Sequence, residues 1–189
     1  MDAFLISFGI IFVAELGDKS QLMAMTFAAR YRAMTILIAI TAATAFVHLF
    51  SVLIGAAVGV AMPPKVISVV AGAAFLGFAA WTLRGDKLDD DDETARVAKS
   101  SRSVFFTVAI AFFLAELGDK TMFATVTLAT EHGLVGTWIG STLGMVAADA
   151  LAIIVGQQLG ARLPERTIKI GAAITFVIFG VLLIAEGFR

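Results

Sequence analysis

The sequence of 189 residues contains no cysteine, and it has only two histidines and three prolines. The absence of cysteine excludes disulfide bonds, zinc–thiolate sites and thiol catalysis. The histidines, His48 and His132, lie far apart and do not form the HExxH pattern of zinc hydrolases. An intramembrane hydrolase would need a nucleophile with its base or a histidine-rich metal site, and neither pattern is present. We therefore expect no enzyme, no catalytic residues and no cofactor.

Charged residues are also scarce, since Asp, Glu, Lys and Arg make up 15% of the chain and the formal net charge is −1. No basic field favours nucleic acid as a partner. Apolar residues, in contrast, account for 59% of the chain, above the roughly 45–50% of soluble domains. The composition therefore indicates an integral membrane protein surrounded by lipid.

Six apolar segments follow one another along the chain. Each is near or above the roughly 20 residues that a spanning helix needs. They cover residues 3–29, 33–61, 66–83, 104–130, 134–161 and 168–188. Helices satisfy their own backbone hydrogen bonds within lipid. The predicted fold class is all-α, a polytopic membrane protein with six transmembrane helices.

The second half of the chain repeats the first with a constant offset. The stretch Ala-Glu-Leu-Gly-Asp-Lys-Ser at 14–20 returns as Ala-Glu-Leu-Gly-Asp-Lys-Thr at 115–121, so counterparts differ by 101 in residue number. The same offset pairs Phe75 with Phe176. The correspondence needs no gap from the first helix to the sixth, which indicates a tandem duplication of a three-helix unit.

An odd number of helices per unit inverts the second unit, because three crossings leave the chain on the opposite side of the membrane. We predict two inverted three-helix repeats joined by an acidic and basic linker, with boundaries at 1–84, 85–103 and 104–189. Ten Lys and Arg residues fall in the loops on the side of the linker, and two fall on the other side. The positive-inside rule therefore places the linker in the cytoplasm and both termini outside.

Each copy of the motif places two carboxylates in an apolar segment, where charge is costly. Positions i and i+3 share a helix face, so Glu15 and Asp18 are expected to point the same way, as are Glu116 and Asp119. Inverted symmetry can bring the two pairs together around one point. Four unpaired carboxylates would repel each other, and a divalent cation removes that penalty. Hard oxygen ligands suit calcium, manganese or magnesium, so these four residues are predicted metal ligands.

Neutral oxygens lie next to the acids in each motif. Ser20, Gln21 and Thr121 are predicted to complete the coordination of the cation. Met122 takes the place of Gln21 in the second copy, so the two halves are not chemically identical. A thioether at this position favours a softer ion such as manganese.

A glycine separates the acids in each copy of the motif. Gly17 and Gly118 either let helices approach closely or open the helix so that a carbonyl turns toward an ion. The motif segments are longer than the ~30 Å hydrocarbon core requires at about 1.5 Å per residue. Either a tilt or a break near the glycine would accommodate the excess, and the sequence leaves both open.

One lysine follows the acids in each copy, and Lys19 and Lys120 have two interpretations. In the first, which the cost of an unpaired buried ammonium favours, they pair with Glu15 and Glu116 at i, i+4 and balance charge. In the second, they are built-in cations that compete with the metal when the site is empty. A salt-bridge network that only locks the halves together is the purely structural alternative, but it does not explain two acids for each base.

A second pair of counterparts, His48 and Asp149, lies in the middle of two other apolar segments. Asp149 has no charged neighbour in the sequence, and an intramembrane acid is a functional candidate. It is predicted to be a further metal ligand or a proton-carrying group. His48 titrates near neutrality and suits proton exchange. A histidine that is hydrogen-bonded within a packed bundle explains His48 equally well.

At these motif residues the chain resembles the GDT family of divalent-cation transporters, whose members carry two copies of Glu-x-Gly-Asp-Lys-Ser/Thr in a duplicated six-helix chain. The resemblance covers essentially the whole sequence. It implies cation exchange against protons, with the motif acids as ligands and two hydroxyls beside them: Glu15, Asp18, Glu116, Asp119, Ser20 and Thr121. The family spans Golgi manganese/calcium transporters and bacterial manganese exporters, and this short chain is similar to the bacterial members.

These patterns predict a secondary transporter that exports Mn²⁺, with Ca²⁺ as the alternative ion, in exchange for protons across a bacterial inner membrane. Its expected partners are divalent cations, protons and membrane lipid, and a homo-oligomer is one arrangement that the sequence permits. The rival function is a passive divalent-cation channel. A channel would not move metal uphill when given only a pH gradient.

Overall fold

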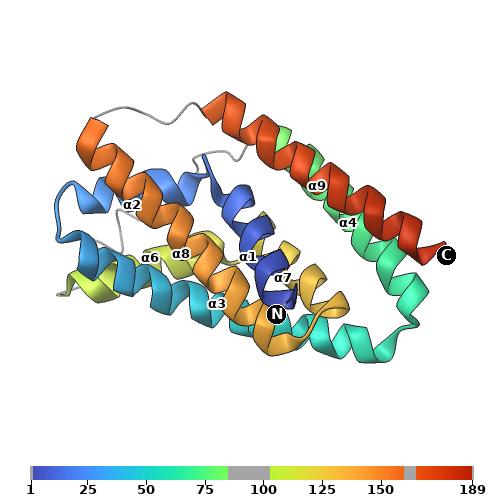
Figure 1. Ribbon diagram of the computed structural model, residues 1–189. Helices are drawn as coiled ribbons and strands as arrows, with labels where there is room; N and C mark the ends of the chain where they lie inside the picture. Colours follow the sequence, from blue (N-terminus) through green and yellow to red (C-terminus); the bar gives the residue numbers. More distant parts are fainter. Residues whose placement is uncertain (1, 85–102, 160–164, 189) are drawn as a thin grey trace.

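The computed structural model describes residues 2–84, 103–159 and 165–188, and the regular structure in these ranges is entirely helical, as predicted (Figure 1). The helices are α1 (Asp2–Glu15), α2 (Lys19–Ala28), α3 (Ala33–Ala61), α4 (Pro64–Arg84), α6 (Val104–Glu116), α7 (Lys120–Glu131), α8 (Leu134–Leu159) and α9 (Glu165–Gly187). Of the linker predicted at 85–103, all but Ser103 lies outside the described residues.

Three helices within the described ranges are long and apolar enough to cross a membrane, namely α3, α4 and the Leu134–Gly156 part of α8. Helix α6 and the Ala173–Gly187 part of α9 are also apolar but shorter. Large apolar side chains such as Phe50, Ile178 and Leu182 are exposed to the surroundings. A surface of this kind suits lipid rather than water. The chain is therefore an integral membrane protein.

Each of the two motif segments is broken at its glycine rather than running as one tilted helix. Gly17 has φ +77° and Gly118 has φ +86°, and they are the only residues with positive φ in the described ranges. This left-handed region is readily open to glycine and strained for residues with a Cβ. The chain then re-enters a helix at Asp18 and at Asp119, which hold extended N-cap conformations before α2 and α7.

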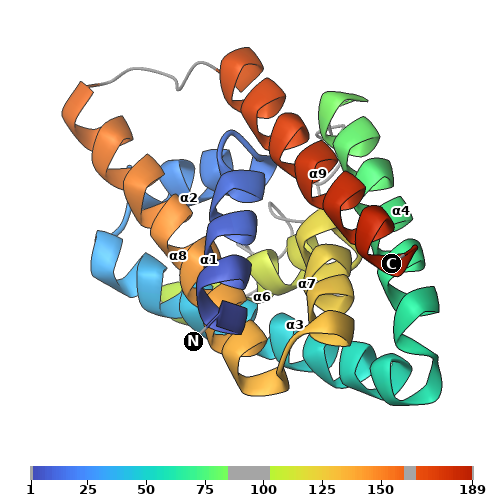
Figure 2. The same ribbon diagram turned by 45° about the vertical axis from the view of Figure 1, so that its right-hand side comes forward.

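The two halves of the chain are packed across each other. Helices α1 and α2 of the first half lie against α8 of the second, and α6 and α7 of the second half lie against α3 of the first. Helices α4 and α9 pack along each other at one edge of the molecule (Figures 1 and 2). Under the offset of 101 residues, α3 corresponds to α8 and α4 to α9, so this exchange of partners is reciprocal.

Glycines allow several of these helices to approach closely, and one pair of these glycines follows the offset. A Cβ on Gly55 of α3 would lie 2.2 Å from the carbonyl oxygen of Val126 on α7. A Cβ on its counterpart, Gly156 of α8, would lie 2.5 Å from the side chain of Met25 on α2, which is the counterpart of Val126. Equivalent positions therefore meet on both sides of the molecule, through a backbone carbonyl at Gly55 and through a side chain at Gly156.

Two pairs of residues contact their own counterparts. The Thr44 hydroxyl donates to the Met145 sulfur at 3.2 Å, and these residues are 101 positions apart. The rings of Phe75 and Phe176 lie 5.8 Å apart between their centroids and are fully buried. A residue touches its own counterpart where a two-fold relation passes between the halves. The repeat read from the sequence is thus expressed in the packing of the described residues.

Candidate functional site

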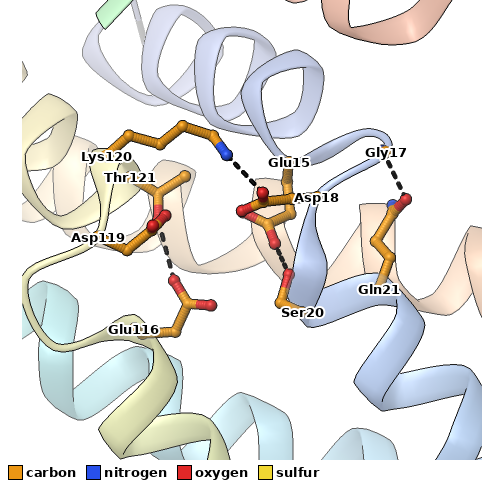
Figure 3. Close-up of polar contacts among 9 residues, drawn as sticks. All are labelled: Glu15, Gly17, Asp18, Ser20, Gln21, Glu116, Asp119, Lys120 and Thr121. Carbon is orange, nitrogen blue, oxygen red and sulfur yellow. Dashed lines mark hydrogen bonds and ion pairs between the residues drawn. The ribbon is translucent and has the colours of Figure 1, made fainter. Parts of the chain in front are cut away.

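The two helix breaks bring the motif residues of both halves into one buried centre. Figure 3 shows Glu15, Asp18 and Ser20 from the first half facing Glu116, Asp119, Lys120 and Thr121 from the second. The four carboxylic acids are each exposed by 5% or less. The predicted convergence of the acids is therefore what the structure shows, although their part in binding metal stays a prediction.

The geometry that produces this convergence differs from the expected one. We predicted that Glu15 and Asp18 would share a face of one continuous helix. Instead Glu15 is the last residue of α1, and Asp18 precedes α2 after the turn at Gly17. The amide of Asp18 donates to the carbonyl of Glu15 at 3.1 Å, which closes this turn. The turn, rather than helical periodicity, aims both side chains inward.

A hydroxyl group holds the first acid of each motif in place. The Ser20 hydroxyl donates to Oε1 of Glu15. In the second half, the Thr121 hydroxyl donates to Oε2 of Glu116 at 3.0 Å and also lies 3.5 Å from an oxygen of Asp119. Both hydroxyls come from the first turn of the helix after the break. Ser20 and Thr121 therefore lie within the acidic centre, where they orient the glutamates, and their part in coordinating a metal stays a prediction.

The residues that follow these hydroxyls stabilise the breaks. The Gln21 side-chain oxygen accepts a hydrogen bond from the amide of Gly17 at 2.7 Å, and its nitrogen donates to the carbonyl of Ala148 at 2.9 Å. In the second half, the sulfur of Met122 accepts from the amide of Gly118 at 3.2 Å. Gln21 was predicted as a metal ligand, and Met122 as a thioether that favours a softer ion. This geometry supports neither prediction, because both side chains form hydrogen bonds that cap a turn.

Lys120 forms an ion pair with the opposite half of the molecule. Its Nζ lies 2.6 Å from Oδ1 of Asp18, and both side chains are 4% exposed. The preferred prediction was an i, i+4 pair with Glu116 along one helix; the break places Glu116 at the end of α6 and Lys120 at the start of α7, so the predicted pair does not lie on one continuous helix. The side chain of Lys19 lies outside the described part of the structure, so its predicted role is untested.

Several oxygens of the centre have no hydrogen-bond partner among the described residues. They include one oxygen each of Glu15, Asp18 and Glu116. A buried polar atom without a partner costs about 1–3 kcal/mol, and more when it is charged. Such groups in a native fold call for water, a proton or an ion. The centre therefore has free capacity to take up positive charge.

Asp149 extends the centre along α8. It is fully buried, both of its oxygens lack a hydrogen-bond partner among the described residues, and it interacts electrostatically with Glu15, Asp18 and Glu116. His48 is equally buried, and neither of its ring nitrogens has a described hydrogen-bond partner. The alternative of a hydrogen-bonded structural histidine therefore finds no support in this packing, and a role in proton transfer stays a prediction.

The acids do not form a finished coordination cage in this conformation. Within the described ranges, no three Asp, Glu or His side chains lie close enough together to hold one metal ion. Lys120 reaches into the same space and occupies an oxygen of Asp18. Binding a metal with several carboxylates would therefore require the halves to move closer and the ammonium to withdraw.

The cross-half ion pair is the site feature that sequence reasoning missed. A glycine between two buried acids was the available signal, because a left-handed turn there ends the i, i+4 relation. The partner of Lys120 could not be named from the sequence, because Asp18 lies 102 positions away and reaches it only through the packing of the halves.

The sequence is similar to a family of known proteins over most of its length. The family described as "Divalent cation/proton antiporter GDT1" matches residues 3–90 and 104–189. A Vibrio cholerae protein named "Putative manganese exporter" is 33% identical over all of this chain and 92% of its own length. A GDT1-like protein of Synechocystis is 27% identical over 96% of both chains, and GDT1-like protein 3 of Arabidopsis thaliana is 28% identical over 95% of this chain and 69% of its own.

No solved structure matches the chain. The family match covers both halves and both copies of the acidic motif, and it omits residues 91–103 of the predicted linker. The chain therefore belongs to the GDT1 family of divalent-cation transporters.

Proposed function

We propose that this protein exports divalent cations, Mn²⁺ foremost and Ca²⁺ as the alternative, in exchange for protons. The observation that carries the proposal is the buried centre in which Glu15, Asp18, Glu116 and Asp119 converge from two halves of the chain. Their carboxylate oxygens are hard ligands that suit these ions. The name of the Vibrio cholerae relative supports manganese as the cargo and export as the direction.

Proton exchange follows from the chemistry of the same oxygens. Metal ligands must be deprotonated, so a carboxylate that takes up a divalent cation gives up its proton. In the absence of metal, buried acids in mutual repulsion take up protons instead. The two forms of the centre then carry different cargo in opposite directions. Asp149, which interacts with the motif acids, is proposed as a further ligand or proton carrier.

We assign the second interpretation to Lys120, that of a built-in cation. Its ammonium is paired with an oxygen of Asp18, a proposed ligand from the opposite half, so the ammonium and a metal would compete for that oxygen. Metal binding replaces this ion pair, and in the empty centre the ammonium compensates the charge of Asp18. Because the pair joins α7 to the turn before α2, its loss also frees the two halves to move relative to each other.

The proposed topology is six spans in two inverted repeats, with boundaries at 1–84, 85–103 and 104–189. The linker faces the cytoplasm of a bacterial cell, both termini face outward, and the halves rock about the acidic centre. Broken helices that meet at a central site are a recurring feature of inverted-repeat transporters. The reciprocal packing of α1 and α2 on α8, and of α6 and α7 on α3, supports this arrangement.

The test is Mn²⁺ transport in proteoliposomes driven only by a pH gradient. We expect uphill accumulation by the wild type and a loss of about tenfold or more for Glu15→Gln and Asp119→Asn, since a hydrogen bond or ligand bond to a charged group contributes roughly 1.5–3 kcal/mol. Glu186→Gln, on an exposed residue of α9, is the matched control and should transport normally. Equal flux in all four proteins would refute the assigned site, and movement only down the metal gradient would indicate the channel instead.

A further inference from the structure

A buried apolar cluster is built on α2, α3, α6 and α8. Four of its eleven buried members, Ala24, Ile36, Ile40 and Val108, are all 0% exposed, and we call these four residues the apolar plug. Ala24 lies one turn beyond Ser20 on α2, and Val108 lies about two turns before Glu116 on α6. The plug therefore occupies the space between the centre and the ends of these helices.

These four residues are the members of the cluster whose counterparts in the other half carry a hydroxyl; the counterparts of the other members are apolar residues or glycine. The offset of 101 pairs Ala24 with Thr125, Ile36 with Thr137, Ile40 with Ser141 and, in the opposite direction, Val108 with Ser7. The four hydroxyl residues are all 0% exposed. We call this set, Ser7, Thr125, Thr137 and Ser141, the hydroxyl track.

Contacts between α1, α3 and α8 place the hydroxyl track between the acidic centre and one end of the molecule. Ser7 lies about two turns before Glu15 on α1, and Thr137 lies in the first turn of α8. The starts of these two helices touch, since a Cβ on Gly136 would lie 2.8 Å from Ala3. Ser141 lies one turn before Met145, which contacts α3 at Thr44, one turn from His48. The track therefore runs toward the end at which the chain begins.

None of the four track hydroxyls has a described hydrogen bond to another helix. Thr125 donates to the carbonyl of Thr121 and Ser141 to that of Trp138, as buried hydroxyls in apolar helices commonly do. The hydroxyls of Ser7 and Thr137 have no described hydrogen-bond partner. An unpartnered buried hydroxyl is destabilising, whereas the apolar residues at the equivalent positions of the plug are not. Packing alone therefore gives no reason for hydroxyls on this side.

We propose that the hydroxyl track is the route by which water, protons and the divalent cation pass between the acidic centre and the surface at the amino-terminal end. The proposal rests on the function proposed above. The hydroxyls replace part of the hydration shell as the ion moves, and His48 lies beside the route with two ring nitrogens available for proton transfer. The apolar plug excludes water from the opposite side in this conformation, as hydrophobic constrictions do in channels.

The absence of cysteine allows this route to be mapped directly in the full chain. Ser7→Cys and Thr137→Cys place one thiol in the track, and Val108→Cys and Ile36→Cys place one at the equivalent positions of the plug. Each protein, reconstituted in liposomes, is treated with a membrane-impermeant cationic methanethiosulfonate. We expect the two track variants to react severalfold faster than the two plug variants, and Mn²⁺ to slow that reaction. Track thiols that react no faster than plug thiols would overturn the proposal.

A transport measurement provides a second readout that does not depend on the reagent. Thr137→Val keeps the side-chain shape and removes the hydroxyl, and we expect Mn²⁺ flux to fall severalfold. Thr82→Val is the matched control, because Thr82 of α4 is also buried with an unpartnered hydroxyl but lies outside the track. Equal flux in Thr137→Val and the wild type would count against the route while leaving the proposed function intact. Absence of Mn²⁺ transport by the wild type would instead refute the proposed function.

Discussion

Replacing Lys120 with methionine removes the ammonium from the acidic centre while preserving most of the side chain's length. In the wild type this ammonium lies 2.6 Å from Asp18, and both side chains are 4% exposed. Removing one partner of such a buried pair destabilises a protein by about 3–5 kcal/mol, because the other charge is left uncompensated. We therefore expect Lys120→Met to be less stable than the wild type by this amount at neutral pH without metal.

The double variant Asp18→Asn, Lys120→Met removes both charges and should recover most of the lost stability, because no new unpaired charge remains from this pair. Unfolding in detergent micelles, followed by circular dichroism with denaturant, measures the three free energies and the coupling between the two positions. Lys65→Met is the matched control, because Lys65 is exposed and should tolerate the change. If Lys120→Met were as stable as the control, the ion pair would not hold the halves together.

The same measurement with Mn²⁺ tests the proposal further, because the Lys120 ammonium and the metal are proposed to compete for the oxygens of Asp18. Mn²⁺ should stabilise Lys120→Met more than it stabilises the wild type, and a tenfold gain in affinity corresponds to about 1.4 kcal/mol. Equal stabilisation of both proteins by Mn²⁺ would mean that the ammonium and the metal do not contest the same oxygens.

Three further predictions follow from the site. Gly118→Ala should lower the free energy of unfolding by about 1–2 kcal/mol, because φ at this position is +86°, which is strained for alanine. Backbone strain is the whole effect, since a Cβ here would meet no atom within 4 Å. An unchanged denaturation midpoint would contradict the left-handed turn. Mn²⁺ binding should weaken as pH falls and should release protons, since metal and protons compete for the same carboxylates; calorimetry in buffers of different ionisation enthalpy would show no difference if this were wrong. Asp149→Asn should lower Mn²⁺ flux severalfold without loss of folding, and normal flux in liposomes would assign Asp149 a packing role.

Much of the architecture could be predicted because it depends on local composition and on the repeat. Apolar runs of membrane length predicted helices, and outside the two broken motif segments the observed bounds agree closely, as for the second segment, Ala33–Ala61. The offset of 101 predicted which residues are equivalent, and Phe75 contacts its predicted counterpart Phe176. The acids of the site were predictable as well, since charges in an apolar run require a partner or a function.

Other features could not be predicted because they depend on a neighbour that is distant in the sequence. The break at Gly17 was one of two alternatives, and it was settled by the capping contact from Gln21 and by the packing of α2 on α8. The partner of Lys120 was predicted within its own segment, yet the ammonium reaches Asp18 because the two turns meet in the centre of the fold. The hydroxyl track emerged only when equivalent positions were compared in the folded chain.

The amino-acid sequence by itself determined that the chain enters the membrane as helices, that it is built from two equivalent units, and that acidic side chains are buried in both. These properties follow from hydrophobicity and from the repeated motif, which act along the chain. Only the tertiary structure decided which charge meets which, and which helices of one half pack against the other. Those outcomes depend on interactions between side chains more than a hundred positions apart, whose distances are set by the crossing of the two halves.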